Sequence, residues 1–199
     1  MSSKSFTVGL KSKIKSFKRI INVDPDKSLS IRSFLIGSIC QKVSIAENVL
    51  ESEDVKNSIL TCRKLGVKII KIKPQKYKIY GKGLGSFYAK KNTQLNFGNS
   101  GTLARLLIGI LSTTPNLEIN IKGDHSLNKR SMREIIKLMS KFGASFLPKN
   151  KFKFPLKLIS TSFPIGINFK AGVSAQIKSA VMLAGLNSFG NTNIIKEEK

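Results

Sequence analysis

Three segments of the chain each place a short polar stretch before a run of mostly aliphatic residues. They read DKSLSIRSFLIGSIC, GNSGTLARLLIGIL and GVSAQIKSAVMLAGL. A helix that is apolar on every side belongs in a protein core, so the pattern predicts three buried helices. If Ser28, Ser100 and Ser174 are equivalent positions, the intervals between the helices are 72 residues (100 − 28) and 74 residues (174 − 100).

Two other segments have the apolar spacing of amphipathic helices. EDVKNSILTCRKLGVKI and SMREIIKLMSKFGASF carry apolar residues at every third or fourth position, and each reaches a glycine, Gly66 or Gly143, where the helix would end. The short alternating runs VKIIKIK, YKIYG, LEINIKG, PLKLIST and INFKAG predict β-strands. The chain therefore repeats a unit of roughly 75 residues, made of strand, buried helix, strand, amphipathic helix and strands.

Polar and basic residues stand at the start of all three apolar helices. The free N–H groups and the dipole of a helix N-terminus attract anions. Lys27, Arg32, Arg105 and Lys178 lie in or near these first turns, where a positive side chain opposes the helix dipole and has no evident structural purpose. Because three related helices packed side by side would open on a common face, we expect an anion-binding site there.

Single residues at these helix starts also have a purely structural interpretation. Each of the three serines would serve as an ordinary helix N-cap. Gly98 and Gly101 would simply form a turn. The anion site is favoured by the recurrence of a basic residue at all three starts, and not by any one position.

The composition narrows the class of partner. The chain has 35 basic and 11 acidic residues, a net charge of +24, which by itself suggests a polyanion. Only six basic residues are arginine, the lysines are spread along the whole chain, and tryptophan is absent. Because nucleic-acid faces interleave basic and aromatic side chains, the pattern favours a lysine-rich solvated surface and no nucleic-acid partner. A basic nucleic-acid-binding module is the alternative from a different class.

Other features point to a soluble protein of the cytoplasm. No apolar run approaches the ~20 residues that span a bilayer, so we expect no membrane partner. Cys40 and Cys62 lie in apolar helical patterns without the spacing of metal ligands, so we expect both to be core thiols in a reducing compartment. The basic N-terminal segment lacks the apolar region of a secretory signal, and we expect it to belong to the mature protein.

Five motifs carry a resemblance to a known family. DKSLSIRS, NVLESEDV, FGNSGTLARLL, GDHSLNKRSM and GVSAQIKSAVMLAGL, in this order and spacing, resemble the N-terminal half of the 5-enolpyruvylshikimate-3-phosphate synthase family. The resemblance implies an α/β fold, an inside-out α/β barrel of βαβαββ repeats, in which two domains close over a cleft. It implies that residues 1–22 form a strand segment of a second, missing domain, and that residues 23–199 form a first domain with an incomplete third repeat.

The resemblance also implies an activity. The family transfers the carboxyvinyl group of phosphoenolpyruvate to the 5-hydroxyl of shikimate 3-phosphate and releases phosphate, through a tetrahedral adduct. It uses no metal and no organic cofactor, and the expected protein is a cytoplasmic monomer whose partners are these two small molecules. Because the second domain would supply the acids for proton transfer, we expect the present chain to be inactive alone.

The resemblance assigns roles to individual residues. Lys27 and Arg105 would take part in catalysis, Lys27 by neutralising the departing oxyanion and Arg105 by orienting its loop. The residues implied to bind shikimate 3-phosphate are Lys27, Ser28, Arg32, Ser174 and Gln176, and those implied to bind phosphoenolpyruvate are Lys27, Gly101, Arg130 and Gln176.

Some positions depart from the family pattern. Asp24 and Pro25 replace a usual Pro-Gly, Ile31 replaces a polar residue, and Ser131 replaces a proline. The only clustered acids, Glu51, Glu53 and Asp54, are expected to begin the first amphipathic helix.

Two rival interpretations stay within or near the family. The first is the related enzyme that transfers enolpyruvate to UDP-N-acetylglucosamine. That enzyme normally shows Lys-Asn at the place of Lys27-Ser28, and a reactive cysteine in the loop GDHSLNKRSM, which has none here. The second is a non-catalytic fragment or pseudoenzyme, because the chain supplies only one wall of the cleft.

Overall fold

The structure, a computed structural model, describes residues 9, 18 and 23–196. The expected strand within residues 1–22 rests on residues outside those described. The helices are α1 (Lys27–Ile39), α2 (Glu53–Lys64), α3 (Gly101–Ser112), α4 (His125–Lys129), α5 (Arg133–Lys141) and α6 (Ala175–Gly185). The strands are β1 (Val43–Ala46), β2 (Lys68–Lys73), β3 (Lys76–Tyr80), β4 (Gln94–Asn96), β5 (Glu118–Lys122), β6 (Ser145–Leu147), β7 (Leu156–Ile159), β8 (Asn168–Ala171) and β9 (Asn193–Lys196).

The strands form separate small sheets that follow the predicted repeat. The first sheet has the order β1-β3-β2, all antiparallel, and the second has the order β4-β5-β7-β6, in which β4 and β5 are parallel. α6 connects the parallel strands β8 and β9 in the sequence, just as α3 connects the parallel strands β4 and β5. The second repeat thus shows the complete predicted order of strand, buried helix, strand, amphipathic helix and two strands, with the short α4 inserted before α5.

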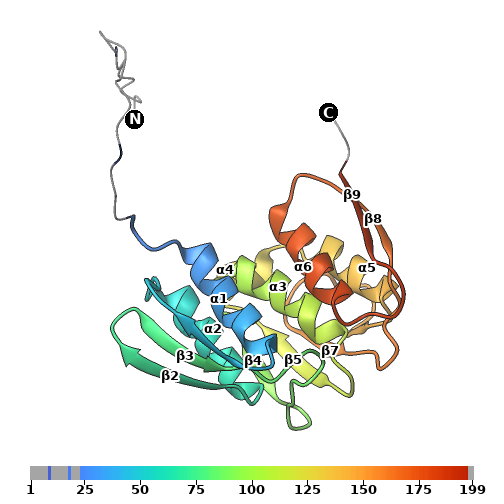
Figure 1. The fold of residues 1–199 in the computed structure, drawn as a ribbon. Coiled ribbons are helices and arrows are strands. Elements are labelled where there is room, and N and C mark those ends of the chain that lie inside the picture. Colours follow the sequence, from blue (N-terminus) through green and yellow to red (C-terminus); the bar gives the residue numbers. More distant parts are fainter. Residues whose placement is uncertain (1–8, 10–17, 19–22, 197–199) are drawn as a thin grey trace.

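The three apolar helices lie inside and the sheets lie outside them. In Figure 1, α1, α3 and α6 run side by side in the same direction, with the sheets around them. α3 is the central helix, since it packs against α1, α5 and α6, and all its residues except Arg105 are buried. The expected inside-out arrangement is confirmed, as is the burial of Leu106, Leu107 and Ile110.

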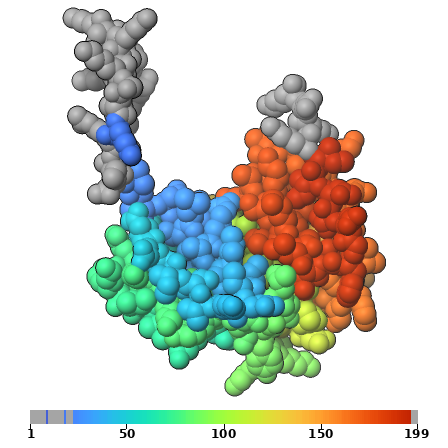
Figure 2. Space-filling model, in the orientation of Figure 1, coloured from blue at the N-terminus to red at the C-terminus, as the bar shows by residue number. Residues whose placement is uncertain are grey.

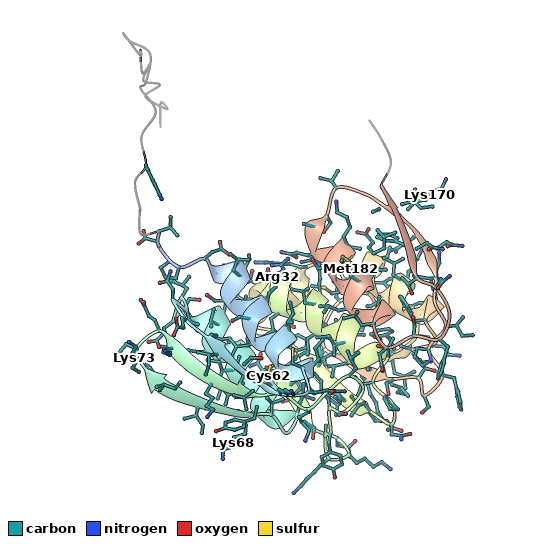
Figure 3. The ribbon with its side chains drawn as sticks, in the orientation of Figure 1. Arg32, Cys62, Lys68, Lys73, Lys170 and Met182 are labelled. Carbon is teal, nitrogen blue, oxygen red and sulfur yellow. The ribbon has the colours of Figure 1, made fainter. Side chains whose placement is uncertain are left out.

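The predicted burial is nearly complete for α3, whereas α1 and α6 each keep an exposed apolar side. Ile36 on α1, Met182 on α6 and Leu186, the C-cap of α6, are about half exposed or more. These residues line a groove of about 560 Å³ between the two helices, with Arg32 at its edge. Figure 2 shows the blue surface of α1 beside the orange and red surface of the last part of the chain, and Figure 3 labels Arg32 on α1 and Met182 on α6. α1 and α6 therefore each present an exposed apolar side chain to this groove.

The helix caps agree with the repeat but shift one of its positions. Ser100 and Ser174 are N-caps, and their hydroxyl oxygens accept hydrogen bonds from the N–H groups of Leu103 and Ile177. The cap of α1 is Asp26, not Ser28, because the Asp26 carboxylate accepts the N–H of Leu29 at 2.7 Å. The three true caps are therefore spaced evenly, 74 residues apart in both intervals (100 − 26 and 174 − 100).

The amphipathic helices and their ends are confirmed. Gly66 and Gly143 follow α2 and α5 with φ values of +85° and +111°, the left-handed conformation that glycine adopts without strain. The five alternating runs correspond to β2, β3, β5, β7 and β8. The sequence pattern did not locate β1, β4, β6 and β9, which have three or four residues each. No helix within the described residues is long and apolar enough to cross a membrane.

The two cysteines differ, which corrects the expectation that both are core thiols. Cys62 on α2 is fully buried, and this burial raises the pKa of its thiol to about 11. Cys40 caps the C-terminus of α1 and is exposed, because the helix ends there at the protein surface.

The first prediction concerns the contact between α3 and α6. A Cβ added at Gly109 would lie 2.5 Å from the carbonyl oxygen of Ala180, a backbone atom that cannot move without its helix. We expect Gly109→Ala to lower the free energy of unfolding by about 1–3 kcal/mol in urea denaturation, despite the better helix propensity of alanine. Gly172→Ala is the control, since nothing lies within 4 Å of its Cβ. Equal stability of the two variants would contradict this packing.

The second prediction concerns thiol reactivity. In the folded chain, a thiol reagent such as dithionitrobenzoate should modify Cys40 quickly and Cys62 only after denaturant is added, because the thiolate is the reactive form and Cys62 is buried. Cys40→Ser should remove the fast reaction. A fast reaction that persists in this variant would show that Cys62 is accessible.

Candidate anion-binding site at the helix N-termini

Side-chain hydrogen bonds join the N-terminal turns of the three inner helices. The amide of Gln176 on α6 donates from Nε2 to Oγ1 of Thr102 on α3 at 3.0 Å, and its Oε1 accepts from Nη1 of Arg105 at 2.7 Å. Arg32 on α1 donates from Nη2 to Oγ of Ser179 on α6 at 3.4 Å. The expected common face of the three N-termini is therefore confirmed.

The start of α1 carries Lys27, Ser28 and Arg32. The Arg32 guanidinium is half-buried and also donates from Nη1 to the Ser28 carbonyl oxygen at 3.2 Å. The Lys27 ammonium lies 3.1 Å from Oδ2 of Asp54, at the start of α2, and half of its side chain is exposed. Arg32 thus has a position fixed by two neutral acceptors, whereas Lys27 is held by one surface ion pair, which is typically worth under about 1 kcal/mol.

The start of α3 brings two guanidinium groups close to Gly101. Arg105 donates from Nη1 to the Gly101 carbonyl oxygen at 3.3 Å. Arg130, which ends α4, donates from Nη2 to Oδ1 of Asn99 at 2.7 Å and to Oγ of Ser126 at 3.4 Å. A Cβ at Gly101 would lie 2.9 Å from Nη1 of Arg105 and 3.5 Å from Nη1 of Arg130. The absence of a side chain at Gly101 is what leaves room for both groups.

Positive charge dominates this face. Among the described residues, none of Arg32, Arg105 and Arg130 forms an ion pair with a carboxylate. Burial lowers the pKa of Arg105, the charge of Arg130 lowers it further, and Glu134 opposes both effects. Arginine stays protonated in spite of such shifts. Two neighbouring cations at a helix N-terminus, of which Arg105 is half-buried and Arg130 exposed, form a site that an anion would stabilise.

The start of α6 carries Ser174 and Gln176. The Ser174 hydroxyl oxygen accepts the N–H of Ile177 at 3.4 Å, and the side chain is exposed. Its O–H remains available as a donor. Lys178, one turn further on, is half-buried.

Two of the unusual positions at the site, Ile31 and Ser131, have local structural roles. Ile31 is fully buried and belongs to the core, so an apolar residue suits this position. Pro25 directly precedes the cap Asp26, and the hydroxyl oxygen of Ser131 accepts the N–H of Arg133 at the start of α5. Asp24 is exposed.

The acidic cluster divides into two roles. Glu53 and Asp54 occupy the first turn of α2, as expected. Glu51 lies before that helix and instead accepts hydrogen bonds from Lys71, the Tyr77 hydroxyl and the Gln75 N–H, which together lower its pKa to about 2. The expectation that Glu51 begins the first amphipathic helix is therefore wrong. Its carboxylate instead links the loop before α2 to β2 and β3 through these hydrogen bonds.

Four residues of the site received no role in it from the sequence, although each lies within one of the five motifs. They are the hydrogen-bonding or ionic partners of the expected residues, namely Asp54 for Lys27, Ser179 for Arg32, Asn99 for Arg130 and Thr102 for Gln176. Thr102 had a detectable signal, since it stands 74 residues before Gln176 (176 − 102), the same interval that separates the helix caps. Within the described residues, no group of three or more His, Cys, Asp or Glu side chains is placed to hold a metal ion.

The fold and the residues at the helix N-termini define a class of protein: an α/β repeat protein of the enolpyruvyl transferase fold, with basic side chains gathered at the N-termini of its inner helices. A model of the family described as EPSP synthase (3-phosphoshikimate 1-carboxyvinyltransferase) matches residues 11–199. The chain belongs to the EPSP synthase family.

Individual relatives agree with this assignment. The 3-phosphoshikimate 1-carboxyvinyltransferase of Leuconostoc mesenteroides is 39% identical over 178 residues, and that of Paramagnetospirillum magneticum is 37% identical over 177 residues. These matches cover 89% and 88% of this chain, but only 40% and 39% of the relatives. The solved EPSP synthase of Acinetobacter baumannii superimposes with a TM-score of 0.81 at 34% identity, over 90% of this chain and 40% of that one. The chain thus spans about 40% of the length of these relatives.

The third prediction concerns Gly101. In Gly101→Ala the new methyl group would meet the flexible end of Arg105, which can move, so we expect the free energy of unfolding to change by less than about 1 kcal/mol. The Arg105 guanidinium should leave Gln176, which would shift the Arg105 Nε–H resonance in a nuclear magnetic resonance spectrum. An unchanged resonance would contradict the close approach of these groups.

Proposed function

We propose that this chain forms part of an enzyme that transfers the carboxyvinyl group of phosphoenolpyruvate to the 5-hydroxyl of shikimate 3-phosphate, releasing phosphate. The observation that carries the proposal is the face where three helix N-termini meet three guanidinium groups without carboxylate partners among the described residues. Both substrates are small polyanions. The 5-hydroxyl oxygen and the oxygen of the departing phosphate also need positive groups nearby to balance the negative charge that develops on them. Membership of the EPSP synthase family selects this pair of substrates from among other anions.

Shikimate 3-phosphate would bind between α1 and α6. A hydrogen bond from Arg32 to Ser179 already joins these helices. A phosphate placed there would accept hydrogen bonds from the Arg32 guanidinium and from the hydroxyls of Ser28 and Ser174. Gln176 would contribute its amide beside them. Hydrogen bonds from charged donors contribute about 1.5–3 kcal/mol each, which would make Arg32 the main determinant of affinity.

Phosphoenolpyruvate would bind at the start of α3. Arg130 would pair with its anionic groups, and the open space at Gly101 would let the backbone approach the ligand closely. Arg105 would orient the α3 loop through its bond to the Gly101 carbonyl oxygen, and Gln176 would reach this ligand as well. The Gln176 amide would lie between the two sites. It belongs to α6, beside the site for shikimate 3-phosphate, and it accepts a hydrogen bond from Arg105, beside the site for phosphoenolpyruvate.

Lys27 would serve both substrates. Its ammonium group is half exposed and held by Asp54, and this surface pair is weak enough to rearrange when a ligand phosphate arrives. As the tetrahedral adduct loses phosphate, a cation at this position would neutralise the departing oxyanion.

Residues 23–199 would form the first of two domains, and the protein would act as a cytoplasmic monomer without a nucleic-acid partner. The chain would bind but not turn over its substrates, because proton transfer to and from the reacting atoms needs acid–base groups that each contribute about 10²–10⁴-fold. Closure of a second wall would also exclude water from the site.

The fourth prediction is a binding measurement. Isothermal titration calorimetry should detect weak binding of shikimate 3-phosphate to this chain, and Arg32→Ala or Gln176→Ala should lower the affinity, Arg32→Ala by about tenfold or more. Lys73→Ala is the matched control, because it removes the same charge from β2, far from the inner helices (Figure 3). Equal affinity in wild type, Arg32→Ala and Gln176→Ala would refute the assigned site.

The fifth prediction concerns turnover. With both substrates, this chain alone should release no detectable phosphate, and addition of a matching second domain should restore release, because the acid–base groups then enter the site. Turnover by the isolated chain would show that the present residues suffice. If the completed protein works only after Pro25→Gly, then the conformation before α1 was the limiting defect.

A further inference from the structure

The side-chain amide of Gln176 forms hydrogen bonds with two residues of α3, one through its oxygen and the other through its nitrogen. Its Oε1 accepts from Arg105 at 2.7 Å, and its Nε2 donates to Thr102 at 3.0 Å. Thr102 is buried, while Arg105 and Gln176 are half-buried. Both contacts join residues more than 70 positions apart in the sequence.

The chemistry of these groups permits only one orientation of the amide. A guanidinium group has only donors, so the oxygen of the Gln176 amide must face Arg105. The nitrogen must then face Thr102, whose hydroxyl oxygen must act as acceptor. Without that acceptor, the partly buried amide nitrogen would have to seek another partner, because an unsatisfied donor is costly there.

We propose that Thr102 is a positioning residue, which holds the Gln176 amide in the orientation that ligand binding requires. Threonine suits this task, because its branched Cβ restricts the side chain to few rotamers in a helix. Thr102 occupies the second position of α3, just as Gln176 and Ser28 occupy the second positions of α6 and α1. The effect on ligands rests on the function proposed above, whereas the effect on the amide does not.

The first test needs no ligand. In a nuclear magnetic resonance spectrum of the 199-residue chain, Thr102→Val should shift the side-chain NH₂ resonances of Gln176, because valine keeps the shape but removes the acceptor. Thr102→Ser should return them close to the wild-type position. Unchanged Gln176 resonances in Thr102→Val, with the fold intact, would overturn the proposal.

The second test measures affinity for shikimate 3-phosphate by calorimetry. Thr102→Val should weaken binding several-fold, Thr102→Ser should restore it, and Thr102→Val should have no further effect in a Gln176→Ala background. A loss of equal size in that background would show that Thr102 does not act through Gln176, and would overturn the proposal. Thr114→Val is the matched control, since it removes a buried hydroxyl from the other end of the same helical region, where it bonds to Ile110. It should leave the affinity unchanged.

The two tests separate this proposal from the function on which it rests. If the unmodified chain does not bind shikimate 3-phosphate, the ligand assignment fails, and the Gln176 resonances alone decide whether Thr102 positions the amide. If wild type binds, and Thr102→Val shifts the resonances but leaves affinity intact, the positioning has no role in binding and the proposal is overturned.

Discussion

The close approach of α3 to α6 is the constraint on which the candidate site depends. Gly109 leaves no side chain between the helices, so the backbone of Ala180 can lie against it. With the helices this close and parallel, Thr102 and Gln176 come within hydrogen-bonding distance at their N-termini. The apolar contact in the middle of the helices and the polar contact at their ends are therefore two results of one packing arrangement.

The same arrangement explains why a largely aliphatic helix begins with polar and charged residues. The apolar length of α3 anchors it among α1, α5 and α6, and only Arg105 of its residues stays partly accessible. Arg105 is in turn held by the Gly101 carbonyl and the Gln176 amide, neither of which carries a charge. Neutral partners fix the geometry of the guanidinium without pairing it with a carboxylate.

The period of the sequence predicted the inner helices, two of their caps and the glycines that end α2 and α5, because each follows from local pattern. It placed the first cap at Ser28, since serine is a common cap, although the carboxylate of Asp26 performs this role. The exposed sides of α1 and α6 could not be predicted, because an apolar pattern does not say which neighbour covers it. Likewise, the pairings of Lys27 with Asp54 and of Arg32 with Ser179 depend on tertiary structure.

The parallel direction of α1, α3 and α6 has an electrostatic consequence for the folding equilibrium. Three dipoles that point the same way place their positive ends together, beside arginine side chains, so like charges repel one another when the site is empty. An anion that binds there relieves this repulsion in the folded state alone. By mass action, a ligand at a hundred times its Kd would add about 2.7 kcal/mol to stability. A bound anion would thus lower the fraction of chains that are unfolded, and with it their exposure to proteolysis.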